Sequence, residues 1–319
     1  MPTPIATSAA VAPYASTAST SAVPSDPAIQ ALRSFQESQI RFRLPDLMAI
    51  LRDRRHEGWI LTAYPDPKTS RPLLGAGFSL DLPERGHPQH DQFNPNQFLE
   101  PSSLELWQAA GLEPKRLQRI LDDYHMRINS WGVRRFRRHL AGLDPEISDA
   151  EASSLLRIAV IQAIANARAY CRDFDNLTAS QQMALTQLVY QMGVNLEEFT
   201  DFLSLINSDS GPSLTTASAS VPVAPQTDRN RWYAVQKALE QSQWARLYRS
   251  RAVAVIAMLD PTYSQSPSLA ERRIAATLRP AVIRRRRVRS VSGLRMVSTG
   301  QPRHSRPRTH RAARGRRKV

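Results

Sequence analysis

The stretch DLMAILRDRRHEGWILTAYPD, from Asp46 to Asp66, joins an amphipathic helical pattern to a short extended one. Its first half places apolar side chains on one helical face, with Pro45 as a helix start and Gly58 as a helix stop. Glu57 therefore falls in the predicted last helical turn, where the negative end of the helix dipole disfavours a carboxylate. A carboxyl group in that place is typical of a general acid with a raised pKa.

The pattern shortens after the glycine, and Pro and Gly become frequent. We predict a small β-region with a strand at Ile60–Tyr64, a turn at Asp66–Pro72 and a second strand at Leu73–Leu80. An isolated Glu and Asp at this spacing are more often a solvated charge and a turn residue, and Asp66 does precede a proline.

From Ser102 to about Met258 the apolar residues recur with the period of a helix. It includes a capping box in which Glu151 stands three residues after Ser148, and a strongly apolar helix that Gly193 closes. We predict a first helix within residues 28–43 and a short helix at residues 268–278. The fold class predicted is α+β and mainly helical.

Positive charge is concentrated at the C-terminal end. The chain carries 43 Lys and Arg against 28 Asp and Glu, a net charge of +15, and residues 281–319 hold 14 of the basic side chains and no acidic one. The other residues have a net charge of only +1. We expect non-specific contact with polyanions, either nucleic acid or an anionic cell envelope, through residues 281–319. The scarcity of aromatic residues there argues against sequence-specific reading of bases.

Cys171 is the single cysteine, which excludes an internal disulfide and indicates a small helix-packing residue. The N-terminus lacks the basic start and the continuous apolar core of a secretory signal peptide. No apolar run is long enough to span a membrane. We expect a monomer that is synthesised in the cytoplasm without a signal peptide.

Four blocks of sequence resemble the phage-type (T-even endolysin-like) lysozymes of glycoside hydrolase family 24, in the family order and with nearly the family spacing. They are Asp46–Arg52 with Glu57-Gly58, Asp66 and Gly75-Ala76-Gly77; Ile147–Ala152; Leu177-Thr178 through Val189-Tyr190-Gln191-Met192-Gly193 to Phe199-Thr200; and Arg231-Trp232 through Trp244 to Arg251-Ala252. The resemblance implies a lysozyme-like fold, with a small β-region after the first helix and a large helical lobe.

The resemblance also implies the extent of the domain. We expect a leader rich in Ala, Ser, Thr and Pro at 1–27, a lysozyme-like domain at 28–263 and a basic, largely disordered tail at 264–319. Within the domain, a helical insertion at about 84–145 and a flexible loop at 207–229 enlarge the chain.

In this family the first-helix Glu is the general acid, which gives that role to Glu57. Asp66 would be the second carboxylate, Arg251 would orient Glu57 as an ion pair, and Tyr190 would line the substrate cleft. The implied activity is inverting hydrolysis of the β-1,4 bond between N-acetylmuramic acid and N-acetylglucosamine in peptidoglycan. It needs no cofactor and no metal. Without a signal peptide, the protein would act on the cell wall after release or delivery.

Several positions depart from the family pattern. The family's water-orienting Thr, six residues after the Asp, is replaced by Pro72 or Leu73, depending on the alignment; Thr69 and Ser70 are nearby hydroxyls. A family His is replaced by Phe78, and cleft-lining polar groups are replaced by Phe202 and Ala238. These departures keep open a catalytically weak or inactive wall-binding or structural protein, or polyanion binding through the tail.

One cluster outside these blocks contains metal-ligand types. His87, His90 and Asp91 lie close together, but Pro and Asn surround them and a fourth ligand is not evident. We interpret them as an ordinary polar loop.

Overall fold

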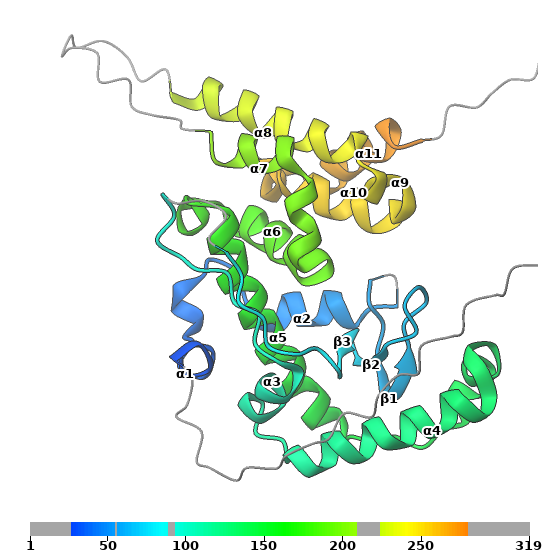
Figure 1. Cartoon of the computed structure of the whole chain (residues 1–319). Coiled ribbons are helices and arrows are strands. Elements are labelled where there is room, and N and C mark those ends of the chain that lie inside the picture. The colour runs from blue at the N-terminus through cyan, green and yellow to red at the C-terminus, as the bar shows by residue number, and fades with distance from the viewer. Residues whose placement is uncertain (1–26, 55, 89–92, 209–223, 280–319) are drawn as a thin grey trace, which may run out of the picture. The chain divides into compact units, whose positions relative to one another are not determined.

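The computed structural model describes residues 27–54, 56–88, 93–208 and 224–279. These residues form a mainly helical domain with a small antiparallel sheet of three strands, which confirms the predicted α+β class (Figure 1). The α-helices are α1 (Pro27–Arg33), α2 (Leu44–Arg52), α3 (Ser103–Ala109), α4 (Pro114–His139), α5 (Asp149–Tyr170), α6 (Ala179–Met192), α7 (Thr200–Ile206), α8 (Ala224–Gln241), α9 (Gln243–Leu247), α10 (Arg249–Met258) and α11 (Pro267–Thr277). The strands are β1 (Ile60–Pro65), β2 (Pro72–Gly75) and β3 (Phe78–Ser79), and the 3₁₀ turns are η1 (Glu37–Gln39), η2 (Leu140–Gly142), η3 (Phe174–Asn176), η4 (Gly193–Glu198) and η5 (Tyr263–Gln265).

Helix α2 starts as predicted but ends earlier. Pro45 lies in its first turn, where its missing N–H costs nothing, and Leu47 and Leu51 are fully buried on the inner face. The next positions on that face fall at 54 and 55, and both are Arg, so a longer helix would bury no further apolar side chain. The helix therefore ends at Arg52, and Glu57 lies in the turn that follows.

The β-region is present, with one difference from the prediction. Strand β1 pairs antiparallel with β2, aligning Ile60 with Gly75 and Tyr64 with Leu73. The single strand predicted at Leu73–Leu80 is two strands, β2 and β3, which pair with each other. Gly75 and Gly77, with φ of 61° and 84°, make the tight turn between them because L-residues with a side chain disfavour those angles.

The free edge of β1 is covered by the segment that enters α5. The N–H of Ala63 donates to the Glu146 carboxylate at 2.7 Å, and the N–H of Glu146 donates to the carbonyl of Leu61 at 2.8 Å. The same carboxylate forms an ion pair with Arg127 of α4 at 2.7 Å. Glu146 thus joins β1 to helix α4 and protects a strand edge that would otherwise be open.

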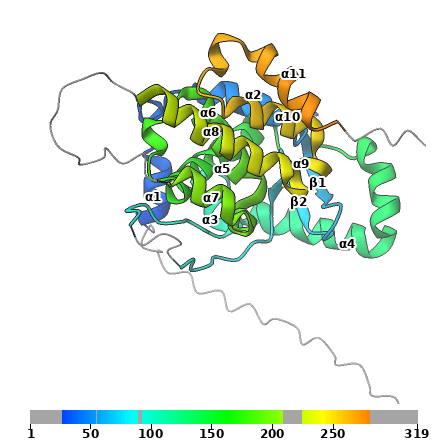
Figure 2. The ribbon, with the colours of Figure 1, turned by 90° about the horizontal axis from the view of Figure 1, so that it is seen from above.

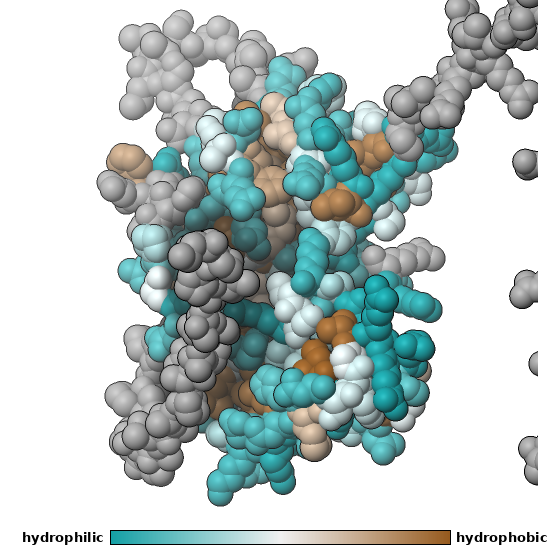
Figure 3. All heavy atoms as spheres, turned by 45° about the vertical axis from the view of Figure 1, so that its right-hand side comes forward, coloured by the Kyte–Doolittle hydropathy of each residue, from teal (hydrophilic) through white to brown (hydrophobic). Residues whose placement is uncertain are grey.

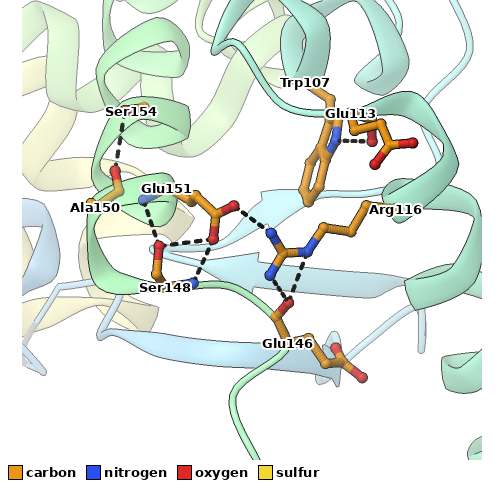
Figure 4. Close-up of polar contacts among 8 residues, drawn as sticks. All are labelled: Trp107, Glu113, Arg116, Glu146, Ser148, Ala150, Glu151 and Ser154. Carbon is orange, nitrogen blue, oxygen red and sulfur yellow. Dashed lines mark hydrogen bonds and ion pairs between the residues drawn. The ribbon is translucent and has the colours of Figure 1, made fainter.

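The start of α5 is fixed by local polar contacts (Figure 4). Ser148 and Glu151 form the predicted capping box, each satisfying a backbone N–H of the other. Arg116 of α4 pairs with Glu151 and donates to the carbonyl of Glu146 at 2.6 Å. These contacts hold the insertion against the helix that forms the centre of the core.

Helices α5 and α6 pack on each other near the middle of the domain (Figure 2), and α5 carries more buried apolar side chains than any other helix or strand among the described residues. Thr178 caps α6, and Gly193, with φ of 52°, ends it where the sequence predicted. Cys171 follows α5 and is a free, buried thiol. No helix among the described residues is long and apolar enough to cross a membrane.

Two predicted boundaries in the C-terminal part are wrong. Helix α8 begins at Ala224, so residues 224–229 are helical instead of belonging to the predicted loop 207–229. The domain continues to Arg279 and does not end at residue 263, because α11 packs on α10 through the buried side chains of Ala270 and Ile274. The short helix predicted at residues 268–278 is present as α11, but it was assigned to the basic tail and not to the domain. The predicted leader 1–27 and the tail from 280 onward lie almost wholly outside the described residues.

Candidate functional site

Glu57 is held in the turn between α2 and β1 by its own backbone. Its N–H donates to the carbonyl of Leu51 at 3.2 Å, and the N–H of Gly58 donates to the carbonyl of Asp53 at 3.2 Å. Gly58 has a φ of 83°, which lets the chain turn sharply into β1. The side chain of Glu57 is 21% exposed and points to the far helical lobe.

Arg251 of α10 meets Glu57 across 194 residues of sequence. Its Nη1 donates to Glu57 Oε1 at 2.8 Å, and its Nη2 donates to the carbonyl of His56. The guanidinium is 11% exposed, so the ion pair is largely removed from water. One arginine therefore binds both the carboxylate and the backbone of the turn, which limits the orientations open to Glu57.

Burial determines the protonation of this carboxyl group. Desolvation raises the pKa of Glu57 above its ordinary value of 4.5, and the charge of Arg251 lowers it by less. From the sequence, the helix dipole would raise this pKa and Arg251 would lower it, which leaves the net direction open. Because α2 ends at Arg52, Glu57 lies outside the last helical turn, and burial takes the place of the helix dipole.

Asp66 stands at the end of β1 and has the opposite environment. Desolvation raises the pKa of its carboxyl, but three hydrogen bonds and the charge of Lys68 outweigh that effect, so the net pKa is lowered. The donors to Oδ1 are the N–H of Lys68 at 2.8 Å and the N–H and hydroxyl of Thr69 at 2.6 and 2.9 Å. Asp66 is thus also the turn residue that the simpler interpretation expected.

The hydroxyl of Tyr64 is affected by the charges of both carboxyl groups, Glu57 and Asp66. Burial raises the pKa of its hydroxyl, the charges of Glu57 and Asp66 raise it further, and a hydrogen bond from the N–H of Gly77 opposes them. Sequence reasoning counted Tyr64 only as a strand residue. Its position two residues before Asp66, on the same face of an extended strand, is the signal that could have singled it out.

Tyr190 reaches the same place from α6. Its hydroxyl donates to the carbonyl of Ala76 at 2.9 Å, in the turn between β2 and β3. Burial raises the pKa of Tyr190, and the charges of Glu57 and Tyr64 add to the effect. On the other side of that turn, a Cβ added to Gly77 would lie 3.5 Å from Glu57 Oε2. The structure therefore brings Glu57, Arg251 and Tyr190 together, and Tyr64 links them to Asp66.

A cleft of about 620 Å³ lies on one side of this cluster, between η4, α7, α8 and α9. Phe202 and Ala238 both line it, at the positions where the sequence comparison expected cleft residues. Tyr248 connects the cleft to the cluster, because its ring centroid lies 5.6 Å from the Arg251 guanidinium and 5.7 Å from Lys68 Nζ. Tyr248 and Lys68 were missed by sequence reasoning, since nothing local distinguishes them.

A second, smaller hollow of about 220 Å³ lies on the other side. Gly77 and Tyr190 form part of its wall, together with Glu100 from the inserted segment. The residues around Glu57 thus contribute to two separate hollows, Tyr248 to the larger one and Gly77 and Tyr190 to the smaller one.

No side chain in the turn after Asp66 replaces the hydroxyl that the family pattern places there to orient water. Pro72 is buried in β2 and Leu73 is half-buried beside it, and neither carries a hydroxyl. Thr69 uses its hydroxyl to bind Asp66 itself. Ser70 has a φ of 62°, and its carbonyl accepts a hydrogen bond from Tyr124 of α4. Phe78 is buried in the core.

The predicted polar loop forms contacts that do not resemble a metal site. His87 lies between Glu100, 3.3 Å from its Nδ1, and Glu197, 2.5 Å from its Nε2. No group of His, Cys, Asp and Glu within the described ranges is arranged to hold a metal ion. His90 and Asp91 lie outside those ranges.

Comparisons with protein-family models, with curated proteins and with solved structures found no match for this chain. What the site can do therefore follows from its own geometry. It has a buried acid with a raised pKa, a second carboxyl with a lowered pKa, and an arginine that fixes the first.

Proposed function

We propose that this protein is a muramidase with a lysozyme-like fold that hydrolyses the β-1,4 bond between N-acetylmuramic acid and N-acetylglucosamine in peptidoglycan. The observation that carries the proposal is the buried ion pair between Glu57 and Arg251. Stability alone gives little reason to bury a carboxylate in a turn and pair it with a residue from a distant helix.

Glycoside hydrolysis needs one protonated and one ionised carboxyl beside the scissile bond. Glu57, whose pKa is raised, is the group that donates a proton to the leaving glycosidic oxygen. Asp66, whose pKa is lowered, is the group that stays ionised, stabilises the oxocarbenium-like transition state and helps position the attacking water. Arg251 positions Glu57, and Tyr190 holds the adjoining turn and walls the smaller hollow. Inversion follows if that water attacks from the face opposite Glu57.

The test is the clearing of a peptidoglycan suspension by the full chain and by Glu57→Gln. We expect the substitution to lower the rate by at least about 10²-fold, because general-acid catalysis contributes that much. Glu84→Gln is the matched control, since Glu84 is exposed on the inserted loop. Equal clearing by the wild type and Glu57→Gln would remove Glu57 from the mechanism.

A second candidate is a wall-binding module with weak or no catalysis. It is favoured by the turn after Asp66. The Thr69 hydroxyl binds the Asp66 carboxylate itself, and neither Pro72 nor Leu73 has a hydroxyl that could orient a water molecule. A folded wild type that co-sediments with peptidoglycan without releasing muropeptides would support this candidate against the first.

A third candidate is polyanion binding by residues 281–319, which carry 14 basic side chains. Deleting those residues and measuring binding to DNA and to cell walls over a range of salt concentrations separates it from wall hydrolysis. Loss of DNA binding with clearing activity retained would assign the two properties to different parts of the chain.

A further inference from the structure

The C-terminal part of α4 is a short, strongly basic arm. Gly132, with φ of 67° and ψ of 161°, breaks the helix and separates the arm Val133–His139 from the rest of α4. Figures 1 and 2 both show this end of α4 at the margin of the described domain, beyond β1. The arm is distinct from the basic C-terminal tail and from the site around Glu57.

The arginines of the arm lie on one side of it. At about 100° per residue, the four side chains cover an arc of roughly 160°, and Phe136 points the opposite way. All four arginines are exposed, whereas Phe136 is completely buried against Tyr124 and Trp131. These arginines are Arg134, Arg135, Arg137 and Arg138. The arm is therefore anchored by its apolar face and presents a purely cationic one.

Nothing within the described residues neutralises this face. The 20 residues from Tyr124 to Leu143 contain no Asp or Glu. In the described part of the chain, none of the four arginines forms an ion pair, although Arg127 on the preceding turn pairs with Asp123 and Glu146. The closest other contacts are Arg138 to the carbonyl of Arg134 and Arg135 over the ring of Trp131.

This arrangement opposes the stability of the arm. Arg134 stands at i,i+3 and i,i+4 from Arg137 and Arg138, spacings at which like charges destabilise a helix. The helix dipole favours cations only in the last turn, which leaves Arg134 and Arg135 without that compensation. An external anionic partner would turn the unfavourable cluster into a favourable one.

We propose that the arm Val133–His139 docks the protein on an anionic phospholipid surface. Guanidinium groups bind phosphate oxygens through paired hydrogen bonds, and each cation near such a surface adds to the binding. Beside its arginines the arm carries no Asn, Gln, Ser or Thr to read base edges, and it has no exposed Phe, Tyr or Trp ring to stack on bases. With its apolar face buried, the arm binds the surface by charge without inserting. Figure 3 brings this side of the molecule forward and shows hydrophilic side chains gathered over it.

The experiment is co-sedimentation of the full chain with phosphatidylcholine vesicles that contain or lack phosphatidylglycerol. The test variant combines Arg134→Gln, Arg135→Gln, Arg137→Gln and Arg138→Gln. The matched control removes four exposed arginines outside the arm, Arg41→Gln, Arg43→Gln, Arg85→Gln and Arg119→Gln, so that net charge and the basic tail are the same in both.

We expect the test variant to bind phosphatidylglycerol vesicles at least about tenfold more weakly than the wild type, and the control to lose far less. If the quadruple variant is unstable, two double variants take its place, one at Arg134 and Arg138 and one at Arg135 and Arg137. Each should lose part of the affinity for phosphatidylglycerol vesicles. Equal losses in test and control variants would overturn the proposal. A test variant that loses more affinity for duplex DNA than for phosphatidylglycerol vesicles, each measured against the control variant, would also overturn it.

Discussion

At the scale of single residues, Glu57 and Asp66 differ because their partners differ. Glu57 is buried with one cation, so desolvation prevails and its pKa is raised. Asp66 accepts three hydrogen bonds in an exposed turn, so its pKa is lowered. The pKa values of two carboxyl groups nine residues apart are thereby shifted in opposite directions, as the proposed acid-catalysed glycoside hydrolysis requires.

The first residue-scale prediction concerns Arg251→Met. Removing the guanidinium removes the charge that lowers the pKa of Glu57, so the alkaline limb of the pH profile of kcat/KM should move to higher pH. Loss of orientation should also lower kcat/KM by about 10²-fold. Arg251→Lys keeps the charge and should keep the limb near its wild-type position. An alkaline limb that stays unchanged in Arg251→Met would contradict a direct interaction with the titrating group.

The second residue-scale prediction concerns stability and pH. Because the folded-state pKa of Glu57 lies above its unfolded value, the ionised carboxyl destabilises the folded state above the folded pKa, and this cost disappears below the unfolded value. Glu57→Gln should therefore raise the free energy of unfolding by about 1 kcal/mol at neutral pH, the size of a typical active-site trade-off.

Urea denaturation at several pH values checks this. The difference between Glu57→Gln and the wild type should shrink as the pH falls through the folded-state pKa and vanish below the ordinary value of 4.5. The exposed control Glu84→Gln should show no such trend. A difference that stays constant with pH would mean that the carboxyl is not destabilising in its ionised form.

At the scale of elements, the inserted helix α4 supports the strand that carries Tyr64. Glu146 is the link, because its carboxylate accepts the N–H of Ala63 and pairs with Arg127. Glu146 lies at the edge of β1 that no strand covers, since β2 pairs with β1 through Ile60 and Tyr64 on the opposite edge. A side chain thus completes the hydrogen bonding that a neighbouring strand would otherwise supply.

We predict that Glu146→Ala lowers the free energy of unfolding by roughly 2–4 kcal/mol, because it leaves the N–H of Ala63 without its acceptor and leaves the largely buried guanidinium of Arg127 with only the longer ion pair to Asp123. Glu113→Ala is the control, since Glu113 is exposed and its carbonyl, not its side chain, binds Trp107. Thermal or urea unfolding followed by circular dichroism measures both. A loss below about 0.5 kcal/mol in Glu146→Ala would show that the edge contact is not stabilising.

At the scale of the whole molecule, the domain extends further than composition indicates. Helix α11 covers α10, and Ile274 is 1% exposed. We predict that a chain ending at Arg279 unfolds like the full chain, whereas one ending at Tyr263 loses roughly 2–3 kcal/mol from exposed apolar surface. Differential scanning calorimetry of both truncations checks the boundary. Equal stability of the two would place the end of the domain before α11.

The sequence predicted those features that local patterns determine. The capping box at Ser148, the helix end at Gly193 and the β-region after Gly58 were found because a few neighbouring residues specify them. The pair of Glu57 with Arg251 was predicted from family spacing alone, since no local pattern joins residues 194 apart.

Other features depend on tertiary packing and could not be predicted in this way. The end of α2 at Arg52 reflects where the apolar face stops, and the role of burial at Glu57 requires the far lobe to be in place. Tyr64 and Tyr248 gain their significance from side chains far away in the sequence. The start of α8 at Ala224 was hidden by a polar composition typical of a loop.

The central claim is tested most directly by identifying the reducing ends that the full chain releases from purified peptidoglycan. Mass spectrometry after borohydride reduction should find muropeptides that end in reduced N-acetylmuramic acid, and Glu57→Gln should release almost none. Products that end in N-acetylglucosamine, or no products from a well-folded wild type, would contradict the assignment of this site as a muramidase.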